Sequence, residues 1–514
     1  MKQCCASQRI STSILHVARR GVKGAVGFAC LAGGIYLNAQ APTDESLAKQ
    51  VEQLTEAMTR TQAQLEQSQR ELQQIRDQLA AVQQQMAQHD SASASASAAQ
   101  LSAAVEEIRE QQTVQESQIA THEQSKVESE SKYPVKLSGL ILLNGFVNTR
   151  RVDIPATPSI VIPGDGSTGA SIRQTVLGVD ARGPHLFNAR SHADFRVDFY
   201  GGELSTSDGA ANAYAGGLIR LRTAHAALQW ERAEAFFSLD HPIINPNAPT
   251  SLTAVAVPGL AWSGNLWTWN PQVGFTQDIP LSTALRLRAQ AALIDVANPP
   301  SVYNFGSATL NYVPPSTAER SRWPGVESRI AVVGPQRDNS FQIGLSGHFA
   351  PHRTAIGTNF DSWAAAVDYF LPLTKRLELS GNVYRGLALG GLGGGAYKDY
   401  VFYFNPDYPE IYYFRALDNV GGWAQLKARA GDHLDFNFAF GTDQVFASQL
   451  RPYAGDPTEY YLNLARNTTY TGNVIYSPSA YLLFSLEYRH LASSPVNGST
   501  NMGDVIGIAT GYRF

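Results

Sequence analysis

The sequence predicts an all-β protein, a sixteen-stranded antiparallel transmembrane barrel that is preceded by an N-terminal α-helical coiled coil. Three observations support this fold class. Apolar residues repeat every seven positions between residues 47 and 86, whereas from residue 133 onward they repeat every second position. The alternating segments have roughly the ten-residue length of membrane-spanning strands. Finally, the connections between these segments are alternately short and long.

Composition limits the possible classes of protein. The chain has 514 residues, of which 16% are charged, and its formal net charge at pH 7 is -4. Because a typical soluble domain carries about 25% charged residues, this chain is poor in charge. It nevertheless contains no apolar run of the roughly 18 residues that a transmembrane helix requires, which excludes a polytopic helical membrane protein. The balanced charge also argues against a nucleic-acid partner.

Residues 1–39 are expected to be a secretory signal peptide. Arg19, Arg20 and Lys23 precede an apolar stretch over residues 24–37, and the small residues that follow favour cleavage after Ala39. A twin-arginine signal and a lipid-anchored cysteine are weaker alternatives. All three cysteines lie within the first 30 residues. The processed chain would therefore contain no thiol, which excludes disulfides, zinc–cysteine sites and cysteine nucleophiles.

Residues 40–90 are predicted to form a periplasmic coiled coil. Nearly six heptads keep the same apolar seam, which predicts a left-handed supercoil. Leucine at a with isoleucine or valine at d favours three or four helices over two, while polar Thr61 and Ser68 interrupt the seam. A single amphipathic helix packed on a domain is the less favoured alternative. The predicted core residues are Leu47, Val51, Leu54, Met58, Leu65, Leu72, Ile75, Leu79, Val82 and Met86.

Residues 91–132 are predicted to be a Ser/Ala spacer followed by a second, weak helical segment. Serine and alanine dominate residues 90–99, and a frayed heptad then runs through Leu101, Val105 and Ile108. Composition leaves both a helical and a flexible spacer open.

Residues 133–514 are predicted to form the barrel. Ile506, Ile508 and Thr510 alternate with small residues in the last strand, for example. The predicted strands are 135–149, 171–182, 188–200, 216–230, 232–240, 267–279, 283–295, 327–334, 340–349, 361–371, 376–386, 420–430, 432–443, 468–477, 480–491 and 503–514. Fourteen or eighteen strands are the alternative counts.

The connections distinguish a membrane barrel from a soluble sandwich. Long connections include 150–170, 241–266, 296–326, 387–419 and 444–467, and they alternate strictly with short ones. An outer-membrane barrel requires this arrangement, with short periplasmic turns and long outer loops. Lipid cannot hydrogen-bond a strand edge, so the sheet must close, and sixteen strands leave an aqueous channel. An interfacial girdle is expected from the aromatic residues near strand ends, which are Tyr369, Phe370, Tyr476, Tyr488, Tyr512 and Phe514.

Charged residues on the lumen face are the candidate functional residues, because a passive pore selects solutes by width and lining charge. Facing rows of cations and acids orient polar solutes and concentrate anions near the basic wall. Alternatively, these charges merely pair across the lumen and hold the barrel round. The candidate cations are Arg190, Arg196, Arg220, Arg222, Arg286, Arg288, Lys427, Arg429 and Arg489, and the candidate acids are Asp194, Asp198, Asp368, Glu378, Asp435 and Glu487.

Two of the long connections have distinctive compositions. The proline-rich loop 241–266 predicts a stiff, irregular segment. Loop 387–419 combines a glycine cluster at residues 390–395 with Tyr397, Tyr400 and further tyrosines. No helix follows these glycines, so a phosphate cradle is not favoured, and the tyrosines either stack sugars or pack the loop on itself.

No catalytic residue, metal site or cofactor is expected. The histidines show no ligand spacing, and we find no Ser/His/Asp arrangement that would make the barrel a lipase. The sequence therefore predicts a protein that is not an enzyme.

Several segments resemble the trimeric porins of Gram-negative outer membranes, particularly the phosphate-selective and DcaP-like group. These segments are residues 218–230, residues 236–241, the coiled coil before the barrel, and the terminal strand that ends in Tyr512 and Phe514. The resemblance implies a homotrimer, recognition of the terminal strand by the barrel assembly machinery, and a loop after the fifth strand that folds into the pore.

The function expected from the sequence is passive diffusion of small hydrophilic solutes across the bacterial outer membrane, with a mild preference for anions. Its partners would be outer-membrane lipid, small polar or anionic solutes and two further copies of the chain. The alternative is a structural protein whose periplasmic coiled coil contacts peptidoglycan and tethers the membrane to the cell wall. At 1.5 Å per residue, the coiled coil would span on the order of 60–70 Å.

Overall fold

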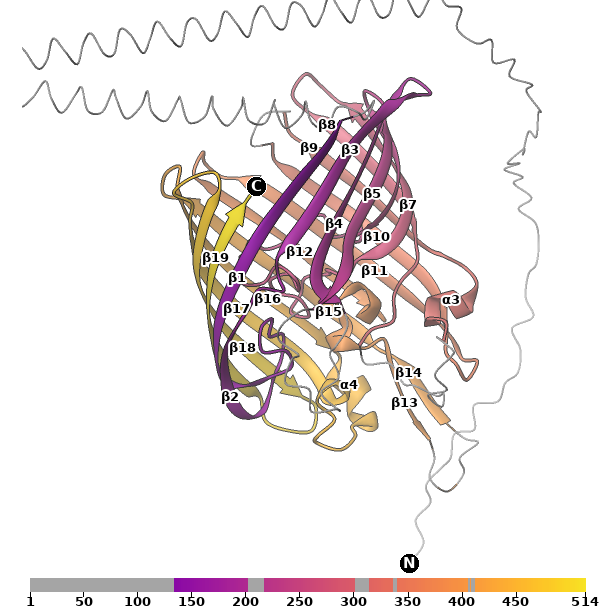
Figure 1. The fold of residues 1–514 in the computed structure, drawn as a ribbon. Coiled ribbons are helices and arrows are strands. Elements are labelled where there is room, and N and C mark those ends of the chain that lie inside the picture. Colours follow the sequence, from indigo (N-terminus) through magenta and orange to yellow (C-terminus); the bar gives the residue numbers. More distant parts are fainter. Residues whose placement is uncertain (1–133, 202–216, 301–313, 336–339, 405–406, 408–411) are drawn as a thin grey trace, which may run out of the picture. The chain divides into compact units, whose positions relative to one another are not determined.

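The computed structural model describes residues 134–201, 217–300, 314–335, 340–404, 407 and 412–514 (Figure 1). The predicted signal peptide, coiled coil and spacer lie outside the described residues. No helix in the described ranges is long and apolar enough to cross a membrane.

Nineteen strands are present in the described part of the chain. They are β1 (Val135–Val152), β2 (Val161–Ser171), β3 (Val176–Leu186), β4 (Ala189–Gly201), β5 (Leu218–Gln229), β6 (Ala233–Asp240), β7 (Asn270–Pro280), β8 (Arg286–Ile294), β9 (Gly325–Val333), β10 (Gln342–Arg353), β11 (Asn359–Pro372), β12 (Leu377–Leu387), β13 (Tyr400–Phe404), β14 (Tyr412–Ala416), β15 (Asp418–Arg429), β16 (Leu434–Val445), β17 (Leu464–Tyr476), β18 (Leu482–Pro495) and β19 (Asn501–Arg513).

Short helices occur only in the connections of the described ranges. They are α3 (Thr317–Ser321), η2 (Gly390–Leu392), η3 (Gly395–Tyr397), α4 (Ala447–Leu450), η4 (Arg451–Tyr453) and α5 (Tyr460–Asn463). The first of these has a complete capping box, in which Ser316 and Glu319 bond each other's backbone N–H.

The strands form a closed antiparallel barrel with sixteen strand positions. Neighbours along the chain pair in order, and β1 pairs with β19 from Leu140–Arg513 to Asn148–Val505, which closes the ring. Strands β2 and β3 share one position, because β3 pairs with the first part of β1 and β2 with the second part. Strands β13 and β14 form a separate hairpin. The predicted barrel and its count of sixteen are therefore confirmed.

The second strand position departs from the sequence prediction. The expected strand 171–182 and the long loop 150–170 are wrong, because β1 continues to Val152 and β2 begins at Val161. The glycine, serine and threonine content of β2 hides its alternation. At the break between β2 and β3, the Thr175 hydroxyl accepts a hydrogen bond from the Leu142 N–H, and the neighbouring Gln174 bonds Thr253 and Val255.

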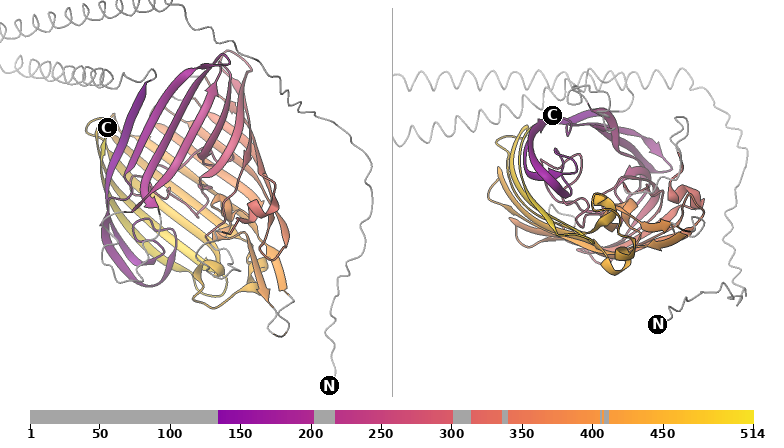
Figure 2. Two further views of the ribbon diagram at one scale, coloured as in Figure 1. Left: turned by 45° about the vertical axis from the view of Figure 1, so that its right-hand side comes forward. Right: turned by 90° about the horizontal axis from the view of Figure 1, so that it is seen from below.

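Short turns and long loops lie at opposite ends of the barrel, as Figures 1 and 2 show. The short turns and the C-terminus share one end, and helix α4 and the β13–β14 hairpin lie at the other. The predicted strict alternation of lengths is wrong at residues 354–358 and 496–500, where the loop end has only five-residue connections. These connections are short because β10 and β18 extend beyond the predicted strands.

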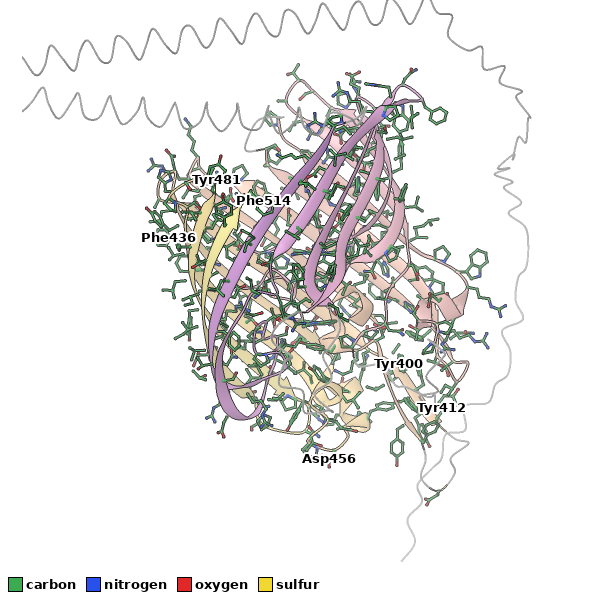
Figure 3. The ribbon with its side chains drawn as sticks, in the orientation of Figure 1. Tyr400, Tyr412, Phe436, Asp456, Tyr481 and Phe514 are labelled. Carbon is green, nitrogen blue, oxygen red and sulfur yellow. The ribbon has the colours of Figure 1, made fainter. Side chains whose placement is uncertain are left out.

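The outward face of the barrel carries apolar side chains that no other part of the described chain covers. Leu143, Leu345 and Phe438 are 54%, 64% and 59% exposed. A soluble monomer rarely exposes so continuous an apolar surface, whereas lipid requires it. Tyr481 and Phe514 lie at the short-turn end of this surface (Figure 3). Phe370 is an exception to the predicted girdle, because it follows buried Asp368 by two positions and shares the inward face.

The hydrophobic core lies inside the barrel, between the inner wall and the loops that enter it. One buried cluster contains Trp262, Tyr397, Leu417 and Leu450, which come from connections at the loop end. A second cluster joins Leu266, Leu389 and Leu392 to inward-facing strand residues. The loops therefore fill part of the interior, and the unfilled part defines the candidate site.

Candidate functional site

Residues 241–269, which connect β6 to β7, run inside the barrel and bond its wall at many points. Their backbone forms no regular structure, so its polar groups need partners from elsewhere. Glu327 on β9 accepts from the Ile243 N–H at 2.8 Å, Asn382 on β12 donates to the Ile244 carbonyl at 2.9 Å, and Gln425 on β15 accepts from the Thr250 N–H at 2.6 Å. Inward-facing polar residues thus fix the path of this loop.

Further residues of the barrel also hold the same loop. Gln174 accepts from the Val255 N–H at 2.7 Å and donates to the Thr253 carbonyl at 3.0 Å. Asn473 on β17 donates to the Thr250 carbonyl at 2.8 Å. The inward fold that the family resemblance implies for the loop after the fifth strand is therefore present.

Glu487 and Arg489 on β18 are part of this attachment. The Glu487 carboxylate accepts from the hydroxyls of Ser251 at 2.6 Å and Thr253 at 2.7 Å. Arg489 donates to the Thr253 hydroxyl and to Glu487. Both charged side chains are almost fully buried. The structure places these two candidate pore residues under the loop and out of the open lumen.

Residues 388–399, which lie between β12 and β13, also pack inside. Tyr397 stacks on Trp262, with ring centroids 4.3 Å apart, and Tyr400 is buried against Phe360. Packing, one of the two outcomes expected for the loop tyrosines, is therefore confirmed for these two. The glycine cluster does hold an anion, but it is the chain's own Asp399, whose Oδ1 accepts from the N–H groups of Gly390 and Gly391 at 2.7 and 3.3 Å.

Two buried charges at the end of this segment have strongly shifted pKa values. Burial raises the pKa of Asp399 to about 7, although the bonds from Gly390 and Gly391 oppose the shift. Burial also lowers the pKa of Lys398 to about 7. The Lys398 ammonium donates to the carbonyls of Ala396 and Leu464, both at 2.7 Å. Lys398 therefore anchors the loop to Leu464 at the start of β17.

The wall formed by β3–β8 carries charges that remain partly exposed to the lumen. Arg196 bonds Asp180 at 2.7 Å and lies 3.7 Å from Asp194. Arg286 and Arg288 both bond Asp278, at 3.1 and 2.8 Å. The side chains of these two arginines and Asp278 are 22–30% exposed. Cations and acids therefore pair along the wall but still contact solvent.

Arg220 and Arg222 lie where the inward loop meets this wall. Arg220 bonds both carboxylate oxygens of buried Asp198, at 3.0 and 2.6 Å, and donates to the Ala256 carbonyl at 2.8 Å. The guanidinium carbons of Arg220 and Arg222 lie 5.0 and 5.1 Å from the ring centroid of Trp269. The two arginines, the indole and the loop backbone together narrow the lumen.

Arg222 differs from its neighbour because it has no anionic partner. Within the described ranges it makes no hydrogen bond and no ion pair; its guanidinium contacts Trp269, and Asp198 and Asp240 act on its charge only through space. It faces a cavity of about 550 Å³ that no aspartate or glutamate lines. The lining includes Lys136, Arg196, Arg222, His241, Trp269 and Arg513. Burial lowers the pKa of His241.

The remaining candidate pore-lining residues lie nearer the short turns. Lys427 bonds Asp435 at 3.2 Å and Arg429 bonds Glu378 at 3.0 Å. Arg190 is an exposed residue at the start of β4. A role in solute selection remains a prediction for each candidate.

Sequence reasoning did not single out several inward-facing groups. Fully buried Arg329 bonds Asp368 at 2.7 and 2.8 Å, and His348 lies 3.1 Å from Glu327. Arg329 alternates with apolar Ile330 in a predicted strand, so alternation alone could have identified it. Trp269 lies in the predicted strand 267–279, but β7 begins at Asn270, so its contact with the two arginines depends on the path of the loop.

Comparison with solved structures places this geometry among known barrels. The outer membrane channel DcaP of Acinetobacter baumannii aligns with a TM-score of 0.55 at 15% identity, over 75% of this chain and 99% of that one. The fold is that of the DcaP channel. An anion-selective porin from Comamonas acidovorans aligns at 10% identity over 74% of this chain and all of its own, with a TM-score of 0.43. OprB of Pseudomonas putida aligns at 12% identity over 74% of this chain and 94% of its own, with a TM-score of 0.44.

No family model matches the sequence, and no curated protein matches it. The likeness to DcaP is therefore one of barrel fold.

Proposed function

We propose that the chain forms an outer-membrane channel for passive diffusion of small hydrophilic solutes, with a mild preference for anions. The observation that supports it best is a closed barrel whose outward face is apolar while the β3–β8 wall exposes charged groups to the lumen. Lipid stabilises the first surface and water the second. Such a pore needs no catalytic residue, since width and lining charge select the solute.

The preference for anions rests on the cavity beside the inward loop. Its lining contains four cationic side chains and no acidic side chain, although the last residue, Phe514, also lines it and carries the terminal carboxylate. Arg222 is the strongest candidate for direct contact, because its guanidinium has no partner in the described residues and presents a planar fork that fits carboxylate or phosphate. A low-dielectric wall beside it strengthens the attraction.

Single-channel recording in planar bilayers tests the proposal. The purified protein should give stepwise conductance, and its reversal potential in a KCl gradient should show that chloride passes more readily than potassium. Arg222→Glu should reduce or reverse that preference, whereas Lys375→Gln, which removes an exposed charge in the 373–376 turn, should leave it unchanged. The absence of discrete steps from folded protein would overturn the channel, and an unchanged preference in Arg222→Glu would overturn the role of Arg222.

We also propose that the channel is a homotrimer. The outward face of β15–β19 is hollowed by a groove of about 870 Å³ whose lining includes Thr442, Gln444, Arg466, Thr468 and His490. Polar groups are poorly solvated by lipid, so a protein surface is the better occupant. A second copy of the chain supplies one, and the heptad pattern that favours three or four helices supports the same assembly.

Mass measurement in detergent tests this assembly. The wild-type protein should have the mass of three chains, and Ala492→Trp, which fills the groove on β18, should shift the mass toward one chain. Ala291→Trp is the matched control, because Ala291 is exposed on the outward face of β8, a strand that does not line the groove. A monomeric wild-type protein, or trimers that persist in Ala492→Trp, would contradict the proposal.

A further inference from the structure

Three metal-ligating side chains converge on the inner wall of the barrel, outside the constriction. His192 lies on β4, His225 on β5 and Glu234 on β6, and the ligand atoms of all three lie within 4.8 Å of one another. His225 Nε2 and Glu234 Oε1 are 3.7 Å apart. We propose that these residues bind a divalent transition-metal ion of the zinc class.

The strand register explains why the three side chains meet. His192 is opposite Ala227 on β5, and Glu234 is opposite Gln229, two positions further along the same strand. His225 is two positions from Ala227 in the other direction, so one imidazole and the carboxylate approach each other over the small Ala227 side chain. Ala227 is 6% exposed, and a larger residue there would separate the ligands.

The two imidazoles are available for a ligand. The described residues provide no hydrogen-bond partner for either ring. His225 Nε2 approaches the Glu234 carboxylate, but at 3.7 Å the two atoms are too far apart for a hydrogen bond. The rings of His192 and His225 stack with centroids 5.6 Å apart, and His225 also stacks on buried Phe236 at 5.5 Å. These contacts restrict the rings, and both histidines remain partly exposed. Hydrogen bonding within the protein therefore leaves the cluster unexplained.

The donor set selects the type of ion. Imidazole nitrogen and carboxylate oxygen are zinc ligands with bonds of about 2.0–2.2 Å, so two ligand atoms on a tetrahedral ion lie about 3.3–3.5 Å apart. Small rotations of the three side chains would bring their atoms to that spacing. Calcium and magnesium prefer oxygen ligands throughout, whereas copper, nickel and zinc accept imidazole. The fourth position would face the lumen and take water or a solute group.

The location gives the ion a consequence for the pore. All three residues lie on strands β4–β6 close to the turns 187–188 and 230–232, at the short-turn end. A bound divalent cation would add positive charge to the wall beside the path of solutes. It would also place a ligand-exchange position in that path, where carboxylate-bearing solutes bind zinc-like ions directly.

Isothermal titration calorimetry with Zn²⁺ and Ni²⁺ tests the site on the intact chain in detergent, purified without a histidine tag. His192→Ala and His225→Ala should each weaken one binding event by about tenfold or more, because loss of even an outer-shell partner of a metal ligand costs about 10–100-fold in affinity. His185→Ala is the matched control, because His185 is exposed at the same end on β3 and lies outside the cluster. It should bind as the wild-type protein does.

Heat-dependent mobility in detergent gels checks that each variant is folded. Equal Zn²⁺ affinity in the wild-type protein and in the folded His192→Ala/His225→Ala double variant would overturn the site, as would no binding at millimolar Zn²⁺. Calorimetry does not depend on conduction, so failure of the metal site and failure of the channel are distinguishable. In bilayers, Zn²⁺ should change the anion current of the wild-type protein and leave the anion current of the double variant unchanged. An equal change in both proteins would also contradict the site.

Discussion

Two regions of the inner wall carry the same kind of sequence but have different roles in the structure. On β9–β18, inward-facing Glu327, Asn382 and Glu487 are buried because the loop 241–269 bonds them. On β3–β8, Arg196 and Arg288 pair with acids but stay about 30% exposed. In both regions a polar residue recurs at every second position. The loop path, and not the strand pattern, decides which polar residues contact solutes.

The comparison shows that a charged lumen residue can serve attachment or selection. Glu487 attaches the loop through two hydroxyls, whereas Arg222 has no anionic partner in the described ranges. Burial makes the first kind of residue important for stability, and partial exposure makes the second kind available to solutes. Variants in the two regions should therefore affect different measurements.

The largest effect is expected for the buried ion pair. Arg329→Met leaves Asp368 charged and unpaired, and removing one partner of a buried pair costs about 3–5 kcal/mol. Urea-induced unfolding of the barrel in detergent measures this loss in the free energy of unfolding. Arg288→Met is the matched change in the exposed region and should cost about 1 kcal/mol or less, because exposed pairs contribute little. Equal losses in the two variants would contradict the distinction between the regions.

The next effect concerns the attachment of the loop. Glu487→Ala removes the acceptor of the Ser251 and Thr253 hydroxyls and also leaves buried Arg489 without its carboxylate partner, which costs about 3–5 kcal/mol. The free energy of unfolding should fall by about that amount, and single-channel current should become noisier as the loop is released. Asp435→Ala, which removes a partly exposed acid, is the control. A quiet, unchanged current in Glu487→Ala would show that the loop is held elsewhere.

A smaller, pH-dependent effect is expected from Asp399. Because its pKa is raised from 3.8 to about 7, the folded chain binds this proton more tightly than the unfolded chain. Its contribution to stability is therefore fully present below the ordinary pKa and is lost as pH rises toward 7, with a slope of up to about 1.4 kcal/mol per pH unit.

Asp399→Asn isolates that slope. The free energy of unfolding of the wild-type protein should decline more steeply between about pH 4 and pH 7 than that of the variant. Lys398, whose pKa is lowered to about 7, regains stability only above that pH, so it does not obscure the comparison. Parallel pH profiles for the two proteins would rule out a titrating Asp399.

Much of the barrel could be predicted from the sequence, since alternation within a strand is a local property. The sixteen strand positions and the inward faces of Arg220, Arg288 and Asp435 follow from it. The glycine-rich β2 has little apolar alternation and escaped prediction. The bonds between Glu487 and Ser251 join residues 236 positions apart, and no local pattern carries such a contact. His192 and His225 likewise meet through strand register, and their spacing in sequence does not reveal it.

Cysteine accessibility tests most directly whether solutes follow the β3–β8 wall. The chain's three cysteines lie within its first 30 residues, outside the barrel. A cysteine introduced into the barrel is therefore easily distinguished from them. We predict that a charged methanethiosulfonate reagent reacts with Arg222→Cys and reduces its single-channel current, and that Asn473→Cys, which lies under the loop, reacts slowly and keeps its current. Rapid reaction and block at Asn473→Cys, with no effect at Arg222→Cys, would contradict the account.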